Sequence, residues 1–136
     1  MKLAIIFEKD DASSEKTSES LKLFGYVTAS VKSASEAFNV LGAINANVIV
    51  IYSASSPEER RLIPNELKRI GPDTTIILIT DSEGDYLQAR VQGFPGVDAV
   101  IKRPASVEAF RRVLDTELDT CFRTARIVPD HERRKR

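Results

Sequence analysis

The chain has 136 residues, of which 42% are hydrophobic and 29% are charged, as is typical of one soluble globular domain with an ordinary core. Its 20 basic and 20 acidic side chains balance, so the overall charge favours no polyanionic partner, and its longest apolar runs have the length of strands, too short to span a membrane. The single cysteine, Cys121, excludes an internal disulfide. We therefore expect a cytoplasmic protein without a membrane segment.

Short apolar runs rich in β-branched residues alternate with amphipathic segments along the chain. The runs predict strands covered on both faces, at residues 3–7, 27–31, 48–51, 76–79 and 97–101. The intervening segments predict helices at about 12–24, 35–41, 64–70, 85–92 and 106–124. Gly25 is expected to stop the first helix, and Pro64 is expected to open the third. Five β–α units in series predict an open parallel sheet with helices on both faces.

The last helix has the clearest amphipathic pattern. Ser106 is placed to cap it, and its apolar residues recur at helical spacing along one face or beside it: Val107, Phe110, Val113, Leu114, Leu118, Cys121 and Phe122. Val107 is expected on the face toward the sheet. A helix of this length overhangs a strand of five or six residues, so its final turn, with Leu118 and Phe122, is the predicted contact for a partner.

The final residues of the chain differ in charge from the rest. Residues 123–136 carry six basic side chains against two acidic ones. This composition predicts a basic tail or the start of a linker to an output domain, which leaves residues 1–122 as the folded domain.

Loops at the carboxyl ends of the strands carry the ligand sites of open α/β sheets. Here they contain EKDD at 8–11, YSASS at 52–56, TDSEG at 80–84 and KRP at 102–104. The acidic first loop repels a nucleotide or flavin phosphate, so we expect no cofactor. Glu8 and Asp10 offer two carboxylates to a divalent cation, but Lys9 lies between them and the third strand adds none, so we expect no metal. A solvated first helical turn is the alternative explanation of these acids.

Three stretches together resemble the receiver domain of two-component response regulators. YVTASVKSASEAFNVL at 26–41 runs without a gap through the family's second strand and helix. GVDAVIKRP at 96–104 is similar to the Gly-Ala-Asp-Asp-Tyr-Leu-x-Lys-Pro segment at its fifth strand, and IILIT at 76–80 to its fourth strand with the switch threonine. The resemblance covers about residues 1–122. It implies a flavodoxin-like (βα)5 fold, a three-layer α/β/α sandwich whose five-stranded parallel sheet has the order 2-1-3-4-5.

The phosphoryl-transfer residues of receivers are altered in this chain. Receivers accept phosphate from a histidine kinase onto an aspartate that ends the third strand, and acids after the first strand hold Mg²⁺. The acceptor position falls on Tyr52 when counted from Asn47, or on Ser53 when counted back from Pro57, and neither is aspartate. The acid pair reduces to Glu8 with Lys9, or to Glu8 with Asp10. The Lys9 ammonium is expected in the space where a receiver holds its cation.

The fifth loop is similarly ambiguous. Receivers bind phosphoryl oxygens through a lysine before a proline, and counting back from Pro104 places Arg103 there, whereas counting forward from Asp98 places Lys102 there. The peptide before that proline is cis in receivers, so Arg103–Pro104 is expected to be cis. Thr80 keeps the place of the switch threonine, or is only a strand-end hydroxyl bonded to nearby backbone. Val100 or Ala99 replaces its aromatic partner.

These departures predict an atypical receiver, or pseudo-receiver, that is not an enzyme. It is expected to regulate a transcriptional or other output module through protein contacts. The expected partner is an output domain, a signalling protein or a second copy bound through the fourth helix, the fifth strand and the fifth helix, with no direct contact to nucleic acid. One alternative is a receiver phosphorylated on Ser53 or Tyr52, although a hydroxyl needs a base that the sequence does not show. Another is a flavodoxin-like small-ligand binder or enzyme.

Overall fold

Parallel strands and helices alternate through the computed structural model, which describes residues 2–52, 57–81, 83–84, 86, 96–119 and 126–128. The strands are β1 (Lys2–Phe7), β2 (Tyr26–Val31), β3 (Val48–Tyr52), β4 (Thr75–Thr80), β5 (Ala99–Lys102) and β6 (Arg126–Val128). The helices are α1 (Asp11–Lys22), α2 (Ala34–Ala43), α3 (Pro57–Ile70) and α5 (Val107–Asp119). Residues 83, 84 and 86 are helical, and most of the helix predicted at 85–92 lies outside the described residues.

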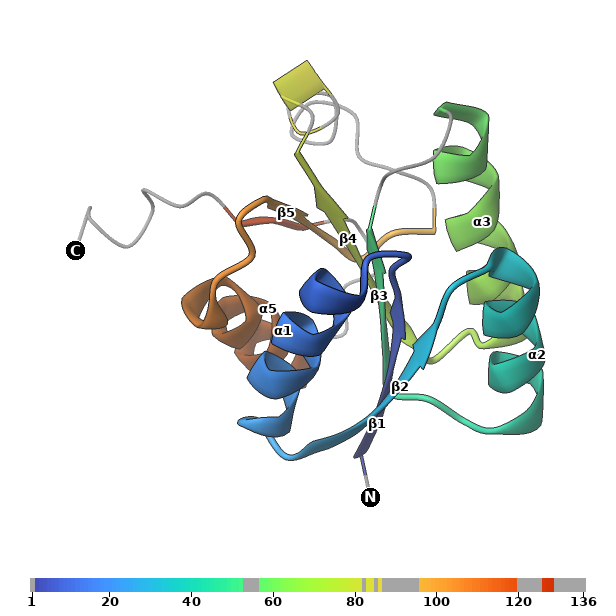
Figure 1. Cartoon of the computed structure of the whole chain (residues 1–136), viewed down its shortest axis with the longest axis horizontal. Coiled ribbons are helices and arrows are strands. Elements are labelled where there is room, and N and C mark those ends of the chain that lie inside the picture. Colours follow the sequence, from blue (N-terminus) through green and yellow to red (C-terminus); the bar gives the residue numbers. More distant parts are fainter. Residues whose placement is uncertain are drawn as a thin grey trace.

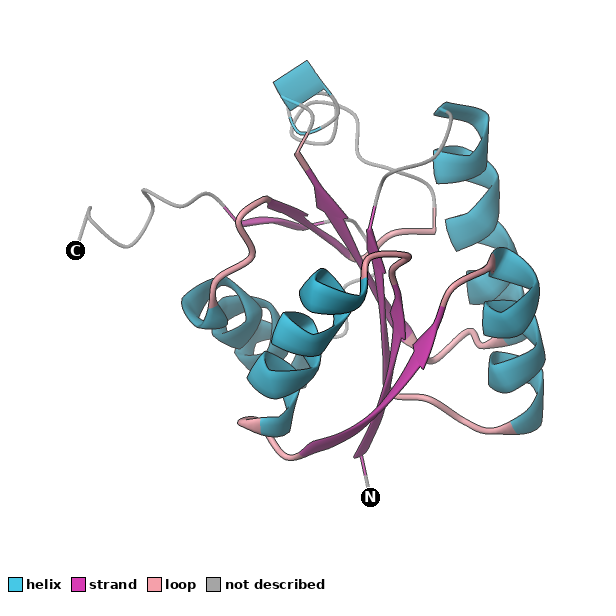
Figure 2. Ribbon diagram, in the orientation of Figure 1, coloured by secondary structure: helices cyan, strands magenta, loops and turns pink. Residues whose placement is uncertain are grey.

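The sheet has the order β2-β1-β3-β4-β5-β6, and every neighbouring pair is parallel. Its first five strands confirm the predicted flavodoxin-like order 2-1-3-4-5. Helices α1 and α5 cover one face, and α2 and α3 cover the other (Figure 1). Figure 2 shows the resulting three layers. Because Phe7 is in register with both Val31 and Ile51, the carboxyl ends of three strands meet at one edge of the sheet.

The sixth strand was not expected from the sequence. Arg126–Val128 pairs in parallel with residues 99–101 of β5. Three residues of the predicted basic tail therefore belong to the sheet, and the rest of that segment lies outside the described residues. The physical reason is the open edge of β5, whose backbone N–H and C=O groups would otherwise lack a strand partner.

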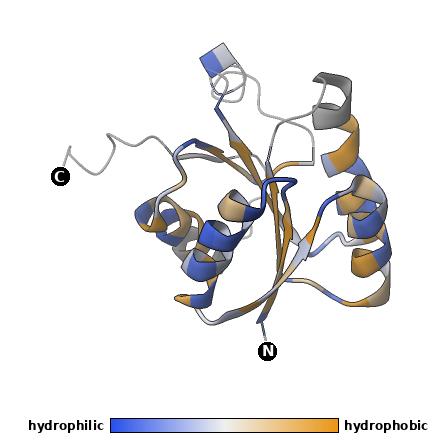
Figure 3. Cartoon of the chain, in the orientation of Figure 1, coloured by the Kyte–Doolittle hydropathy of each residue, from blue (hydrophilic) through white to orange (hydrophobic). Residues whose placement is uncertain are grey.

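Two apolar layers fill the space between the sheet and its helices. One layer packs strand residues such as Ile5 and Ile49 against α2 and α3. The other packs Ile6 and Val50 against α1 and α5. The central strands are buried on both faces, as their continuous apolar runs predicted, and Figure 3 shows them among the most hydrophobic parts of the chain.

The helix ends show which local signals were interpreted correctly. Gly25 has φ +89°, a left-handed conformation that favours glycine, and it follows α1 as predicted. The third helix begins at Pro57, so its predicted start at Pro64 is wrong. Pro64 is buried inside α3 beside Gly96. A Cβ on Gly96 would come within 2.8 Å of the Pro64 carbonyl carbon, so this close approach requires glycine.

Helix α5 buries Phe110 and Leu114 against the sheet, as its pattern predicted, and it also buries Val113, which was expected beside that face. The prediction that Val107 also faces the sheet is wrong, because Val107 begins the helix and is 40% exposed. The predicted overhang at Phe122 lies outside the described residues, as does the Leu118 side chain. Within the described part of the chain, no helix combines the length and apolar character needed to cross a bilayer.

Candidate functional site

The loop after β1 turns one carboxylate inward. Glu8 is only 6% exposed, and its backbone N–H donates to the carbonyl oxygen of Val31 at 3.2 Å. Its side chain accepts the Asp10 N–H at 3.3 Å and lies 3.7 Å from an Arg103 Nη. A buried carboxylate needs such partners, because desolvation disfavours its charged form.

The neighbouring acids belong to the helix start. Asp10 accepts the Ser13 N–H at 2.9 Å as the N-cap of α1, and its hydrogen bonds to Ser13 lower the Asp10 pKa. Asp11 is exposed and pairs with Lys32 at 2.6 Å. The explanation of a solvated first turn therefore fits Asp10 and Asp11 but not Glu8.

Lys9 does not take the predicted place of the cation. Its side chain is exposed, and the cationic group beside Glu8 is the guanidinium of Arg103. Glu8 faces inward at the end of β1, and the next residue of the loop faces solvent. The predicted role of Lys9 is therefore wrong.

Tyr52 is the last residue of β3, at the strand end where the acceptor position was sought. Its hydroxyl is hydrogen-bonded to the Thr17 hydroxyl of α1, and the Arg103 guanidinium lies over its ring, 4.7 Å from the centroid. Burial raises the pKa of Tyr52, so the phenol is protonated at neutral pH. The alternative position, Ser53, lies outside the described residues.

Arg103 and Lys102, the two candidate residues of the fifth loop, point to different neighbours. The Arg103 side chain reaches Glu8, Tyr52 and Ser13, the last through a hydrogen bond at 3.5 Å. Lys102 instead lies 3.1 Å from Glu83. The Arg103–Pro104 peptide is cis, as predicted. Arg103 therefore occupies the site.

Thr80 contributes to the site from the end of β4. It ends that strand, is 1% exposed, and its carbonyl oxygen accepts the Arg103 N–H at 2.7 Å. The positions predicted to lack the aromatic partner, Ala99 and Val100, are both buried in β5. Thr80 thus lies at the end of β4, in register with Lys102 of β5.

Helix α1 reaches the sheet mainly through hydroxyl groups. Ser14 bonds Ser30 at 2.8 Å and Ser18 bonds Thr28 at 2.6 Å, in addition to the Thr17–Tyr52 bond. Leu21 is its only buried apolar residue, and Figure 3 shows α1 as a largely hydrophilic helix. The serine-rich sequence of this helix was the available signal for these contacts.

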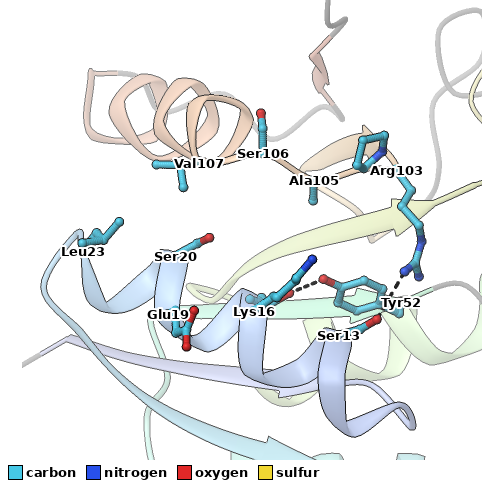
Figure 4. Close-up of a pocket in the computed structure, with 12 residues that line it drawn as sticks. Ser13, Lys16, Glu19, Ser20, Leu23, Tyr52, Arg103, Ala105, Ser106 and Val107 are labelled. Atoms are coloured by element: carbon cyan, nitrogen blue, oxygen red, sulfur yellow. Dashed lines mark hydrogen bonds between the residues drawn. The ribbon is translucent and has the colours of Figure 1, made fainter.

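An open groove of about 520 Å³ continues from Tyr52 and Arg103 between α1 and the start of α5. Figure 4 shows Ser13, Lys16 and Ser20 on its α1 side, facing Ala105 and Ser106. Sequence reasoning missed this groove, because it depends on how two helices far apart in the chain lie on the same face of the sheet.

No protein-family model and no curated protein sequence matches the chain. Solved structures do match. A CheY-like response regulator receiver domain from Methylobacillus flagellatus has a TM-score of 0.72 at 15% identity, covering 85% of this chain and 98% of its own. The beryllofluoride-activated NtrC4 receiver domain dimer has a TM-score of 0.71 at 21% identity, covering 88% and 98%.

A response regulator from Burkholderia pseudomallei, solved with a phosphorylated aspartic acid, a calcium ion and citrate, is also similar. Its TM-score is 0.68 at 19% identity, and the match covers 88% of this chain and 72% of that one. Likeness at these identities establishes the fold that the chain shares with receiver domains.

Proposed function

We propose that this chain is a receiver-like regulatory domain, a pseudo-receiver, that acts through protein contacts rather than by phosphorylation of an aspartate. The observation that carries the proposal is the arrangement at the strand ends. Tyr52 ends β3, and the Arg103 guanidinium covers its ring and lies beside Glu8. Phosphoryl transfer in receivers uses a carboxylate at the end of the third strand and a divalent cation, whereas here β3 ends in a phenol and a guanidinium lies beside Glu8.

The electrostatics of the site oppose a bound Mg²⁺. Glu8 is the only buried acid among Glu8, Asp10 and Asp11, and Arg103 lies 3.7 Å from it. Mg²⁺ takes six oxygen ligands, usually one or two protein carboxylates together with waters, and a cation that bound Glu8 would meet the positive charge of the guanidinium.

Tyr52 is a poor acceptor. Its hydroxyl is hydrogen-bonded to Thr17, and burial raises its pKa. A hydroxyl attacks phosphorus well only when a base removes its proton, and the group that lies over the Tyr52 ring is the cation Arg103, which is no base. These contacts favour regulation without catalysis over phosphorylation of Tyr52.

The proposed partner is an output domain, another signalling protein or a second copy of the chain. The surface considered from sequence was the fourth helix with β5 and α5. Because β6 pairs along the outer edge of β5, a partner at that surface would contact β6 rather than add a strand to β5.

Phosphorylation assays test this proposal. The protein is incubated with acetyl phosphate and Mg²⁺ and its intact mass is measured, with a receiver that keeps the acceptor aspartate as the positive control. We expect the control to gain a phosphoryl group and this chain to remain unmodified. A phosphoryl group on Ser53, Tyr52 or a nearby acid would overturn the proposal.

A further inference from the structure

The guanidinium of Arg103 has more hydrogen-bond donors than its described neighbours use. Arginine carries five N–H donors, and the one hydrogen bond of this side chain among the described residues is the 3.5 Å contact with the Ser13 hydroxyl. Carboxylate oxygens of Glu8 and Asp81 lie 3.7 and 3.9 Å away, beyond hydrogen-bond range. The Nε is buried without a hydrogen bond. An oxyanion satisfies such a group best, since its oxygens accept two N–H bonds in parallel.

Two further positive groups lie along the groove that opens beside Arg103. Lys16 lines it from α1, with its amino group directed into the groove (Figure 4), and it has no ion-pair partner among the described residues. The first turn of α5 lines the opposite side through Ser106 and Val107, and a helix start favours negative charge. Glu19 is the acid among the described lining residues, and it lies one turn beyond Lys16.

The far end of the groove is apolar. Leu23 is 71% exposed and Val107 is 40% exposed, and both line it together with Pro104 and Ala105. Leu23, at the end of α1, lies ten positions after Ser13, so the groove runs for about 15 Å along the helix. Its volume of about 520 Å³ lies in the range of small-molecule sites.

We propose that this groove binds a small organic anion non-covalently. A carboxylate or phosphate group would lie against Arg103, Lys16 and Ser13, and an apolar body would cover Leu23 and Val107. The inference rests on the proposed function, because it assigns the same altered site a ligand in place of a covalent phosphoryl group. Because the Tyr52 hydroxyl is hydrogen-bonded to Thr17 of α1, such a ligand would also affect the contacts that hold α1 to the sheet.

Phenyl phosphate is a suitable probe, since it combines an oxyanion with an apolar ring. Titration without Mg²⁺, followed by amide chemical shifts, is expected to give saturable shifts at residues 13–23 and 105–107. Inorganic phosphate is expected to bind about tenfold more weakly, because it leaves the apolar end uncovered. 3-Phenylpropionate is expected to bind at the same residues and so to extend the site to carboxylates.

Variants test the assigned contacts. Arg103→Gln is expected to weaken phenyl phosphate binding about tenfold or more, and Lys16→Gln severalfold. Lys22→Gln, an exposed lysine of α1 outside the groove, is the matched control and should bind as wild type. If Arg103→Gln fails to fold, Lys16→Gln still tests the binding site, because Lys16 is exposed and its replacement should not disturb folding.

Unchanged binding in Lys16→Gln and Arg103→Gln, absence of saturable shifts, or equal affinity for inorganic phosphate would overturn the inference. Intact mass after the titration separates this test from that of the proposed function. Covalent phosphorylation by acetyl phosphate would refute the pseudo-receiver, whereas failure of reversible binding would refute the groove alone.

Discussion

Asp98 offers a direct test of how the amino-terminal ends of β4 and β5 are held to α3. It is 7% exposed just before β5, and one carboxylate oxygen accepts the Ile76 N–H at 2.8 Å and the Lys68 ammonium at 2.5 Å. Lys68 also donates to the Thr74 carbonyl oxygen at 2.7 Å. One side chain therefore joins α3 to the starts of β4 and β5.

The two contacts of Asp98 set the expected cost of removing it. Asp98→Ala leaves the N–H of the fully buried Ile76 without its acceptor, a loss of roughly 1–3 kcal/mol. Breaking a buried ion pair costs about 3–5 kcal/mol, but the Lys68 side chain is 25% exposed and can turn toward water. We therefore expect a total decrease in the free energy of unfolding of about 3–4 kcal/mol. Asp98→Asn keeps an acceptor for Ile76 and should lose about half as much.

Urea unfolding followed by circular dichroism measures these differences. Glu66→Ala is the matched control on α3, since it breaks an exposed ion pair with Arg69 and should leave the midpoint unchanged. Equal losses for Asp98→Ala and Asp98→Asn would refute the role assigned to the Ile76 hydrogen bond. An Asp98→Ala protein as stable as wild type would refute the whole reasoning.

Two predictions concern Tyr52. Tyr52→Phe leaves the Thr17 hydroxyl, which is 3% exposed, without its partner. This change should lower the free energy of unfolding by roughly 1–2 kcal/mol and speed amide exchange in α1. Unchanged amide exchange in α1 would contradict the proposed link between Tyr52 and that helix. Because burial raises the Tyr52 pKa above its ordinary value of 10.0, the unfolded chain releases this proton first. The stability that the protonated phenol contributes is thus complete below that value and lost as the pH rises through the folded pKa. Stability curves of wild type and Tyr52→Phe should converge above pH 10, and parallel curves would contradict a raised pKa.

The central strands could be predicted from sequence because their continuous runs of β-branched and other apolar residues favour burial on both faces. Val48–Tyr52 and Thr75–Thr80 illustrate this, since every residue but Tyr52 is buried. Pro64 misled the prediction of α3 because a proline suits a first helical turn, whereas in the structure it lies inside a helix that begins at Pro57. Strand β6 has three residues and no local signal of its own.

The site was predictable as a set of loops but not as a set of contacts. Glu8, Tyr52, Thr80 and Arg103 were all identified from the loops that follow the strands. Whether Lys9 or Arg103 would lie beside Glu8 depended on the direction of each side chain, which sequence spacing does not specify. The hydroxyl contacts of α1 were likewise hidden, because a serine-rich helix is also compatible with an exposed face.

Titration with beryllofluoride and Mg²⁺ tests the central claim most directly, since the NtrC4 receiver domain, a protein of the same fold, is activated by beryllofluoride. Amide spectra of this chain should show no saturable shift at Glu8, Tyr52 or Thr80, because β3 ends in a phenol and the Arg103 guanidinium beside Glu8 opposes a divalent cation. Saturable shifts centred on these three residues would contradict the account, since they would show a working acceptor and metal site.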